Sequence, residues 1–251
     1  VCSDKPISMQ RFVLNWTGGT LGAFDRKPED KSAEGFALHY SAAVGKTISF
    51  GVVGSSFDTL NKKGGFAPTR TYAGQFADVA SHWSLEYVKT AYEYDLANGT
   101  SASAFSPEGT FTVAQAQTAA VNIHTAYNGT KVRAAAAGEA WYTPYVAYCI
   151  ENGIIKDGQF TDYNKNITRG EMAIVFANIL PESEYKAIRT YTLSDMDDTL
   201  PSAAAVKKLA EAGIVGGAGG KYNPQNDIKR GEACVIFTRI AVAAMRDAKA
   251  N

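Results

Sequence analysis

The chain has 251 residues, of which 45% are hydrophobic and 20% are charged. This composition is typical of a soluble globular protein and excludes a disordered one. Lysine plus arginine and aspartate plus glutamate each total 25, so the formal net charge is zero. A nucleic-acid or anionic-membrane partner favours a basic excess, so we expect neither. No apolar run reaches the roughly 18 residues of a membrane helix, so we expect no membrane insertion.

The start of the chain and the spacing of its cysteines and histidines bear on processing and on metal binding. The chain begins at Val1 without a methionine or a signal-peptide pattern, so we expect it to be a processed or excised part of a longer protein. The cysteines and histidines are scattered, without the spacing of a metal site or a Cys/His nucleophile: Cys2, Cys149, Cys234, His39, His82 and His124. We therefore predict no metal and no cofactor.

Residues 1–75 are predicted to form a small β-rich segment of unknown function. The runs RFVLNW, FALHY and TISFGVV combine β-branched and aromatic residues and are separated by glycine, proline and charged clusters. About 70 residues with three or four strands are marginal as an independent fold. We find no pair of carboxylates with a partnering base or nucleophile there, so we predict no enzyme activity.

A ten-residue pattern recurs in the rest of the chain. It reads ITRGEMAIVF at 167–176 and IKRGEACVIF at 228–237, with a fainter copy, FTVAQAQTAA, at 111–120. Each copy opens an apolar stripe with i, i+3, i+4, i+7 spacing, which predicts one face of an amphipathic helix. In two copies a capping box, Thr112 with Gln115 and Thr168 with Glu171, is expected to start this helix.

A second helix is predicted upstream of each copy. Its stripe has i, i+3, i+4, i+8 spacing around Ala91, Cys149 and Leu209, so Cys149 is expected to be an inert core thiol. Gly153 and Gly213 stand where a helix C-terminus favours left-handed geometry. Each unit is thus a helix, a loop with an aromatic residue, and a second helix, over 76–127, 139–181 and 193–243.

These units resemble the S-layer homology (SLH) domain. The resemblance is carried by FADVASHW and FSPEGTFTVAQA in the first unit, AWYTPYVAYCIENGII and NITRGEMA in the second, and LSDM, LAEAGIV and KYNPQNDIKRGEA in the third. It implies a mainly α fold, a pseudo-threefold bundle of three two-helix repeats preceded by the β-rich segment. The expected divisions are a β-rich segment, 1–75, and SLH repeats at 76–138, 139–192 and 193–251.

The resemblance also implies a function and a location. SLH repeats anchor secreted bacterial surface proteins non-covalently to cell-wall polysaccharide, as in Gram-positive type bacteria. They bind a secondary cell-wall polymer with pyruvylated or otherwise acidic sugar in grooves between repeats. We therefore expect a non-enzymatic protein of the cell surface. Two alternatives stay open: an accessory part of an extracellular enzyme, and a surface-lattice protein whose units self-associate.

Arg169 and Arg230 are the first candidates for binding this sugar. Capping does not explain them, because the macrodipole disfavours a cation in the first turn of a helix. A guanidinium binds a carboxylate through two parallel hydrogen bonds, and the N–H groups of the helix would add to such an anion site. The alternative is a salt bridge with a neighbouring aspartate of another repeat. The first repeat has Val113 at this position, so its site lacks the arginine.

Trp83, Trp141, Asp78 and Asp195 complete the candidate site. The tryptophans precede the first helices of two repeats and are expected either to stack on a sugar ring or to pack in the core. Pro201 replaces this tryptophan in the third repeat. For the aspartates, capping of the turn that enters the first helix is the simpler expectation and ligand contact the other.

Overall fold

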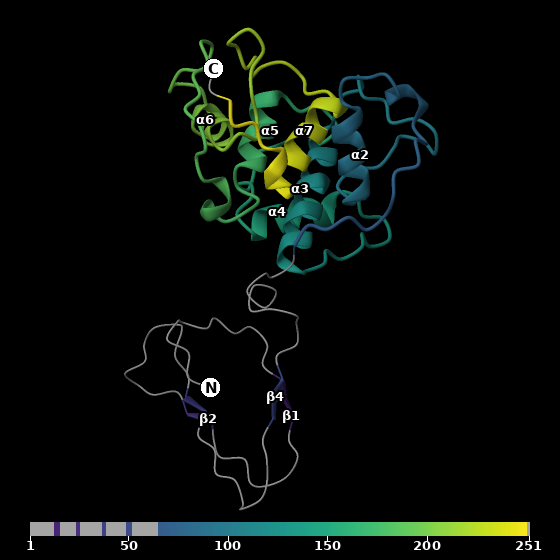
Figure 1. Ribbon diagram of the computed structural model, residues 1–251, viewed down its shortest axis with the longest axis vertical. Helices are drawn as coiled ribbons and strands as arrows, with labels where there is room; N and C mark the ends of the chain where they lie inside the picture. Colours follow the sequence, from purple (N-terminus) through teal and green to yellow (C-terminus); the bar gives the residue numbers. More distant parts are fainter. Residues whose placement is uncertain (1–12, 16–23, 26–36, 39–48, 52–64, 250–251) are drawn as a thin grey trace, which may run out of the picture. The chain divides into compact units, whose positions relative to one another are not determined.

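The computed structural model describes residues 13–15, 24–25, 37–38, 49–51 and 65–249. The chain divides into two compact units, Val1–Lys63 and Gly64–Asn251. The second unit is mainly helical and holds all three repeats (Figure 1). This unit begins at Gly64, before position 76, where we expected the first repeat to begin. The segment before position 76 belongs to it because the backbone N–H groups of Thr69, Arg70 and Tyr72 donate hydrogen bonds to Glu93.

In the first unit the structure describes four short strands. They are β1 (Val13–Asn15), β2 (Phe24–Asp25), β3 (Ala37–Leu38) and β4 (Ser49–Gly51). β1 pairs with β4 and β2 with β3, both antiparallel. β1, β3 and β4 each lie within one of the three runs that predicted strands. Of the rest of the predicted segment, 1–75, residues 65–75 are described and contain no strand, and the other residues fall outside the described ranges.

Six α-helices form the repeats, two in each. The first helices are α2 (Leu85–Glu93), α4 (Thr143–Glu151) and α6 (Ala203–Glu211). The second helices are α3 (Val113–Asn128), α5 (Arg169–Phe176) and α7 (Arg230–Ala241). Short 3-10 turns add η1 (Ala77–Val79), η2 (Glu182–Tyr185) and η3 (Ala243–Met245). We call residues 76–127, 139–181 and 193–243 repeats one, two and three.

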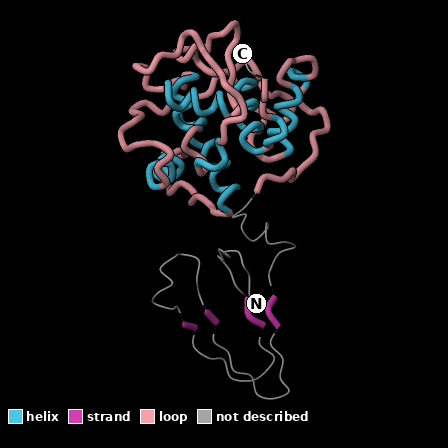
Figure 2. The backbone as a smooth tube through the Cα atoms, turned by 60° about the vertical axis from the view of Figure 1, so that its left-hand side comes forward, coloured by secondary structure: helices cyan, strands magenta, loops and turns pink. Residues whose placement is uncertain are grey.

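The helices pack in a closed cycle. The second helix of each repeat packs on the first helix of the next: α3 on α4, α5 on α6, and α7 back on α2. Figure 1 shows α3, α5 and α7 together in the middle of the unit, and Figure 2 shows loops surrounding the helices. Since the last repeat returns to the first, every repeat has two neighbours, and no apolar helix face is left at an open end.

Backbone hydrogen bonds close the same cycle. The first N–H of each second helix is donated to a loop carbonyl of the next repeat: Val113 to Lys165, Arg169 to Asn226 and Arg230 to Gly109, at 2.8–3.0 Å. The second N–H follows, from Ala114 to Tyr163, Gly170 to Pro224 and Gly231 to Pro107, at 2.8–2.9 Å. Helix N-termini have N–H groups without an intrahelical partner, and here the neighbouring repeat supplies the acceptors.

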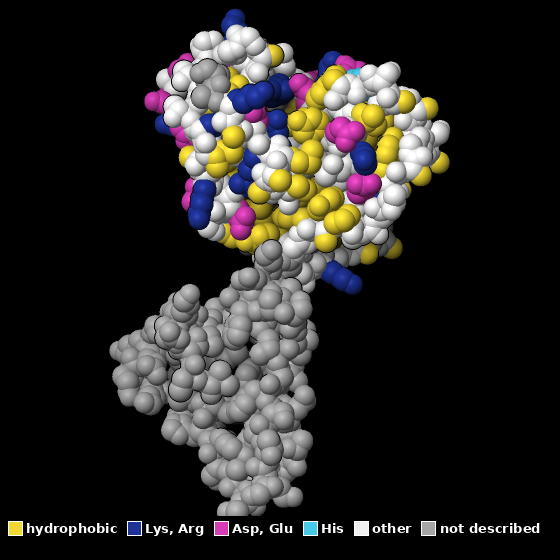
Figure 3. Space-filling view, viewed as in Figure 1, with side chains coloured by type: hydrophobic (Ala, Val, Ile, Leu, Met, Phe, Trp, Pro, Cys, Tyr) yellow, Lys and Arg dark blue, Asp and Glu magenta, His cyan; other side chains and the backbone are white. Residues whose placement is uncertain are grey.

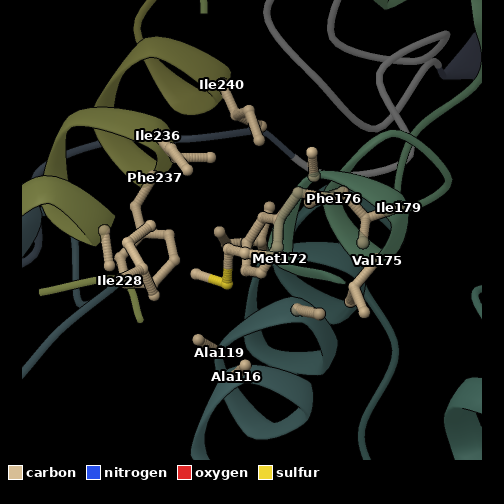
Figure 4. Packing of buried hydrophobic residues seen from close by; sticks show 14 of the residues in the cluster. Ala116, Ala119, Met172, Val175, Phe176, Ile179, Ile228, Ile236, Phe237 and Ile240 are labelled. Atoms are coloured by element: carbon tan, nitrogen blue, oxygen red, sulfur yellow. The ribbon is translucent and has the colours of Figure 1, made fainter. Parts of the chain in front are cut away.

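The predicted stripes form a common core. Phe176, Met172 and Phe237 point toward one another from α5 and α7, with Ala116 and Ala119 of α3 beside them (Figure 4). Phe176, Met172, Phe237 and Ala116 are fully buried, and Ala119 is nearly so. The small alanines of α3 let that helix approach the larger side chains of α5 and α7, which keeps the packing tight.

The predicted helix boundaries are confirmed where they rest on local geometry. Thr112 and Thr168 each cap a second helix, and Gln115 and Glu171 accept from the cap N–H in return. Gly153 and Gly213 have φ of +67° and +70°, the left-handed geometry predicted for them. In repeat three only the glutamate half of the box remains, with Lys229 N–H donating to Glu232 at 2.9 Å.

Candidate functional site

Arg169 lies at the junction of repeats two and three and is fully engaged there. Its Nε donates to the carbonyl of Tyr222 at 2.8 Å, and its guanidinium lies 4.7 Å from the centre of the Tyr222 ring. Its Nη1 forms an ion pair of 2.6 Å with Oε1 of Glu232. A salt bridge between repeats, the alternative to ligand contact, is therefore present, but its partner is a glutamate where we expected an aspartate.

Arg230 occupies the matching position at the junction of repeats three and one. Its Nε donates to the carbonyl of Phe105 at 2.9 Å, and its guanidinium lies 4.7 Å from the centre of the Phe105 ring. Its Nη2 donates to the carbonyl of Asn98 at 2.8 Å. Unlike Arg169, it forms no ion pair with any residue that the structure describes.

The surroundings of Arg230 suit an anion. Burial lowers the pKa of this guanidinium, and the carboxylate of Asp78 opposes the shift from outside salt-bridge distance. Carbonyl oxygens accept hydrogen bonds but carry no full charge, so they compensate a partly buried cation less than a carboxylate would. Arg230 is thus a half-buried positive charge that has no carboxylate within salt-bridge distance among the described residues.

The first two N–H groups of each of these helices are not available to such an anion site. We expected free N–H groups beside the arginines, but those of Arg169, Gly170, Arg230 and Gly231 are already donated to loop carbonyls of the next repeat. The glycines permit this closeness: a Cβ on Gly170 would lie 3.0 Å from the Pro224 carbonyl oxygen. The expectation was wrong because the N–H groups hold the repeats together instead.

Both candidate tryptophans are exposed. Trp83 is 57% exposed and Trp141 is 53% exposed, so neither packs in the core. Trp83 precedes Ser84, the residue before α2, whose Oγ would lie 3.0 Å from a Cβ on Gly231. This contact brings the start of α2 beside the start of α7, where Arg230 lies. Trp141 holds the same place before α4.

Asp78 and Asp195 bind the aromatic loops of their own repeats. Asp78 accepts hydrogen bonds from the N–H groups of Phe105 and Ser106, and Asp195 from those of Tyr222 and Asn223, at 2.6–3.1 Å. The capping of the turn before the first helix, which we expected, is replaced by this longer connection. Each aspartate thereby fixes the loop whose carbonyl receives an arginine Nε.

The three junctions between repeats differ in which candidate arginine and tryptophan residues they bring together. Repeats three and one bring together Arg230 and Trp83. Repeats two and three have Arg169, already paired with Glu232, and Pro201 in place of the tryptophan. Repeats one and two have Trp141 but Val113 in place of the arginine. Among the described residues, an exposed tryptophan and an arginine without a counter-ion therefore meet at one junction.

Sequence reasoning missed several polar residues at this junction. His82 Nε2 lies 3.0 Å from Glu108 Oε1, and Glu108 forms an ion pair with Lys229 across the two repeats. Arg70 donates to Asn98 Oδ1 at 2.8 Å, so Asn98 is held by Arg70 and Arg230 together. The signal for Arg70 was the tripeptide RTY, which occurs at 70–72 and again at 189–191.

Surface charge and possible metal ligands suggest no further candidate site in the described ranges. The face in Figure 3 mixes hydrophobic, basic and acidic side chains over the second unit, in keeping with the balanced net charge. In the described ranges no group of three or more His, Cys, Asp or Glu could hold a metal ion. No helix in those ranges has both the length and the apolar character needed to cross a membrane.

The fold is a closed ring of three two-helix repeats, in which aspartates fix the aromatic loops of repeats one and three. The S-layer homology domain family matches residues 75–116 and 192–234. The chain therefore contains S-layer homology domains, in repeats one and three. Repeat two, which has no counterpart of Asp78 and Asp195 before its first helix, is not among the matched stretches. Domains of this family are known for anchoring surface proteins to the cell wall, which implies a protein associated with the cell surface. No curated protein matches the chain.

Proposed function

We propose that this protein binds an acidic cell-wall glycan through the junction of repeats three and one. Arg230 would meet the carboxylate of the sugar, and Trp83 would stack on a sugar ring. The observation that carries the proposal is the half-buried guanidinium of Arg230, which has carbonyl partners but no counter-ion among the described residues. A charge-assisted, bidentate contact is the natural complement of such a group.

The ligand class is a secondary cell-wall polymer with pyruvylated N-acetylmannosamine or another acidic sugar. This class comes from the family resemblance, and the balanced net charge supports recognition by a local site rather than by a general basic surface. The proposal gives the chain a binding role and no catalytic one, in a secreted protein held at the wall of a Gram-positive type bacterium.

Calorimetric titration with pyruvylated wall-polymer fragments tests the proposal. Arg230→Ala is expected to weaken binding by about 1.5–3 kcal/mol, the cost of a lost charge-assisted contact. Arg230→Lys is expected to restore only part of it, because an ammonium lacks the planar fork of a guanidinium. Arg169→Ala is the matched comparison, since this arginine has the same place in its repeat and its charge is already paired.

Thermal melts of each variant separate binding from unfolding. Wild-type affinity in folded Arg230→Ala would contradict the proposal, as would a loss in Arg169→Ala that equals the loss in Arg230→Ala. Light scattering of the wild-type chain without glycan tests the alternative, a self-associating lattice protein. Assembly that proceeds in the absence of wall polymer and survives Arg230→Ala would favour that alternative.

A further inference from the structure

Arg70, which precedes repeat one, holds the loop that follows α2. Its Nε donates to the carbonyl of Tyr92, and its Nη2 donates to the carbonyl of Ala97 at 3.1 Å and to Oδ1 of Asn98 at 2.8 Å. Its guanidinium lies 3.7 Å from the centre of the Tyr92 ring. One side chain thus connects the end of α2 with two consecutive loop residues, which a guanidinium can do because its donors lie in a rigid plane.

Arg189, which precedes repeat three, makes the corresponding contacts with the loop that follows α6. Its Nε donates to the carbonyl of Ala210 at 2.7 Å, and its Nη2 donates to that of Val215 at 2.6 Å. Both arginines also donate their backbone N–H to the carbonyl of the last residue of the first helix. The same bracing arginine therefore occurs twice, each time just before a stretch that matches the family, 75–116 or 192–234.

The loop after α2 is also where Arg230 is anchored. Arg70 binds the carbonyl of Ala97, and Arg230 binds the next carbonyl, that of Asn98, through Nη2 at 2.8 Å. Arg230 reaches this loop from repeat three because α7 packs on α2 (Figure 1). Consecutive carbonyls are thus held by two different guanidiniums. Because peptide groups are planar and adjacent ones share a Cα, the direction of the second carbonyl depends on how the first is held.

The junction of repeats two and three orients its arginine differently. Arg169 Nη2 lies 3.5 Å from the carbonyl of Gly216, which corresponds to Asn98 and has no side chain to be held. Arg169 is oriented by its ion pair with Glu232 instead. Arg230 has no ion pair among the described residues, so the loop carbonyls are what orient its guanidinium.

We propose that Arg70 is a positioning residue for the site at Arg230. By holding Ala97 and the side chain of Asn98, it fixes the direction of the Asn98 carbonyl, and this carbonyl keeps the plane of the Arg230 guanidinium in the orientation that meets a carboxylate. A bidentate contact tolerates little rotation of that plane, so a displaced acceptor lowers the affinity. The inference rests on the proposed function and adds to it a residue that lies outside the repeats.

The Nε–H NMR signal of Arg230 in the glycan-free chain tests the positioning role. Its assignment comes from its loss in Arg230→Lys, which removes the group. We expect the signal to shift in Arg70→Ala and in Arg70→Lys, because an ammonium lacks the planar fork that holds the loop. Asp95→Asn removes the ion pair of Arg70 at 3.1 Å and leaves its carbonyl contacts, so the signal should keep its wild-type position. Arg133→Ala, at an arginine that precedes repeat two and pairs with Glu139, is the second control.

Calorimetric titration of the same variants with pyruvylated wall-polymer fragments measures the consequence for binding. Arg70→Ala and Arg70→Lys are expected to weaken binding about threefold to tenfold, the equivalent of one lost hydrogen bond and less than the loss in Arg230→Ala. Asp95→Asn and Arg133→Ala should bind as the wild type does. Thermal melts identify the folded variants. Arg70→Lys keeps the charge and the apolar stem, so it gives an answer even where Arg70→Ala unfolds.

The inference and the proposed function fail in different ways. Absence of binding by the wild-type chain would contradict the proposed function. A wild-type position of the Arg230 signal in both Arg70 variants would overturn the positioning role, whether or not the chain binds glycan. Wild-type affinity in folded Arg70→Lys with a shifted Arg230 signal would also overturn it, because the orientation of Arg230 would then not limit binding. An equal loss in Asp95→Asn would assign the effect to the ion pair and reject the inference as well.

Discussion

Phe176 of repeat two stacks on Phe237 of repeat three, with ring centroids 5.2 Å apart and planes inclined by 28°. Phe111 of repeat one meets Phe237 edge-on at 6.0 Å. One aromatic residue from each repeat thus contributes to the same contact, so the core belongs to the whole cycle and not to any single repeat.

Truncation of this core is expected to destabilise all three repeats together. Phe176→Ala or Phe237→Ala should lower the free energy of unfolding by about 3–5 kcal/mol, since both rings are fully buried. Urea unfolding followed by far-ultraviolet circular dichroism measures the loss. Ile188→Ala removes an exposed apolar group and should cost little by comparison. A small change in Phe237→Ala would mean that the aromatic contact does not fill the core.

The ion pair of Arg169 with Glu232 joins two repeats and is expected to contribute to stability. Arg169→Ala should lower the free energy of unfolding by about 1–3 kcal/mol, because a partly buried carboxylate and the Tyr222 carbonyl lose their donor. Glu232→Gln, which keeps the shape but removes the charge, is the companion variant. Equal stability of Arg169→Ala and the wild type would contradict the prediction.

Asp78 and Asp195 are expected to make the fold sensitive to acid. Burial raises the pKa of both carboxyls, but hydrogen bonds from two backbone N–H groups to each outweigh it, so each pKa lies below its ordinary value. Such a group stabilises the folded state at pH above its unfolded pKa, and this contribution is lost as the pH falls through the folded pKa. Stability should therefore decline from about pH 4 downward.

Denaturant midpoints measured at a series of pH values test this dependence. Asp78→Asn and Asp195→Asn should be less stable than the wild type at neutral pH, and the difference should shrink in acid, where the wild-type carboxyls are protonated. A difference that stays constant across the whole series would show that the charge of these carboxyls has no part in holding the loops.

The thiols of Cys149 and Cys234 are expected to be unreactive in the folded protein. Both are fully buried, and burial raises the pKa of each to about 12. The thiolate is the nucleophile in alkylation, so the raised pKa lowers the reaction rate, and burial restricts the access of the reagent. Mass spectrometry after iodoacetamide treatment should find these two sites unmodified in buffer and modified in denaturant. Rapid native alkylation of Cys149 would contradict its assignment as a core thiol.

Local patterns in the sequence determined the six helices of the repeats. Stripes at helical spacing marked the buried faces around Val88, Phe176 and Phe237, and the capping boxes and left-handed glycines marked the ends. These features depend on neighbours within about one turn of helix, so the sequence by itself is sufficient for them. The recurrence of these patterns at the same spacing in three units also indicated the family.

The tertiary structure decided what each repeated residue does. Arg169 and Arg230 stand in nearly identical sequence surroundings, yet one has Glu232 as its counter-ion and the other only carbonyls of Phe105 and Asn98. That difference arises because the cycle closes and brings Arg230 next to residues more than a hundred positions away. Charge compensation depends on distance in space, and no local spacing contains it. Packing between repeats likewise decided that Trp83 is exposed and that the first N–H groups of the second helices are donated to carbonyls of neighbouring loops.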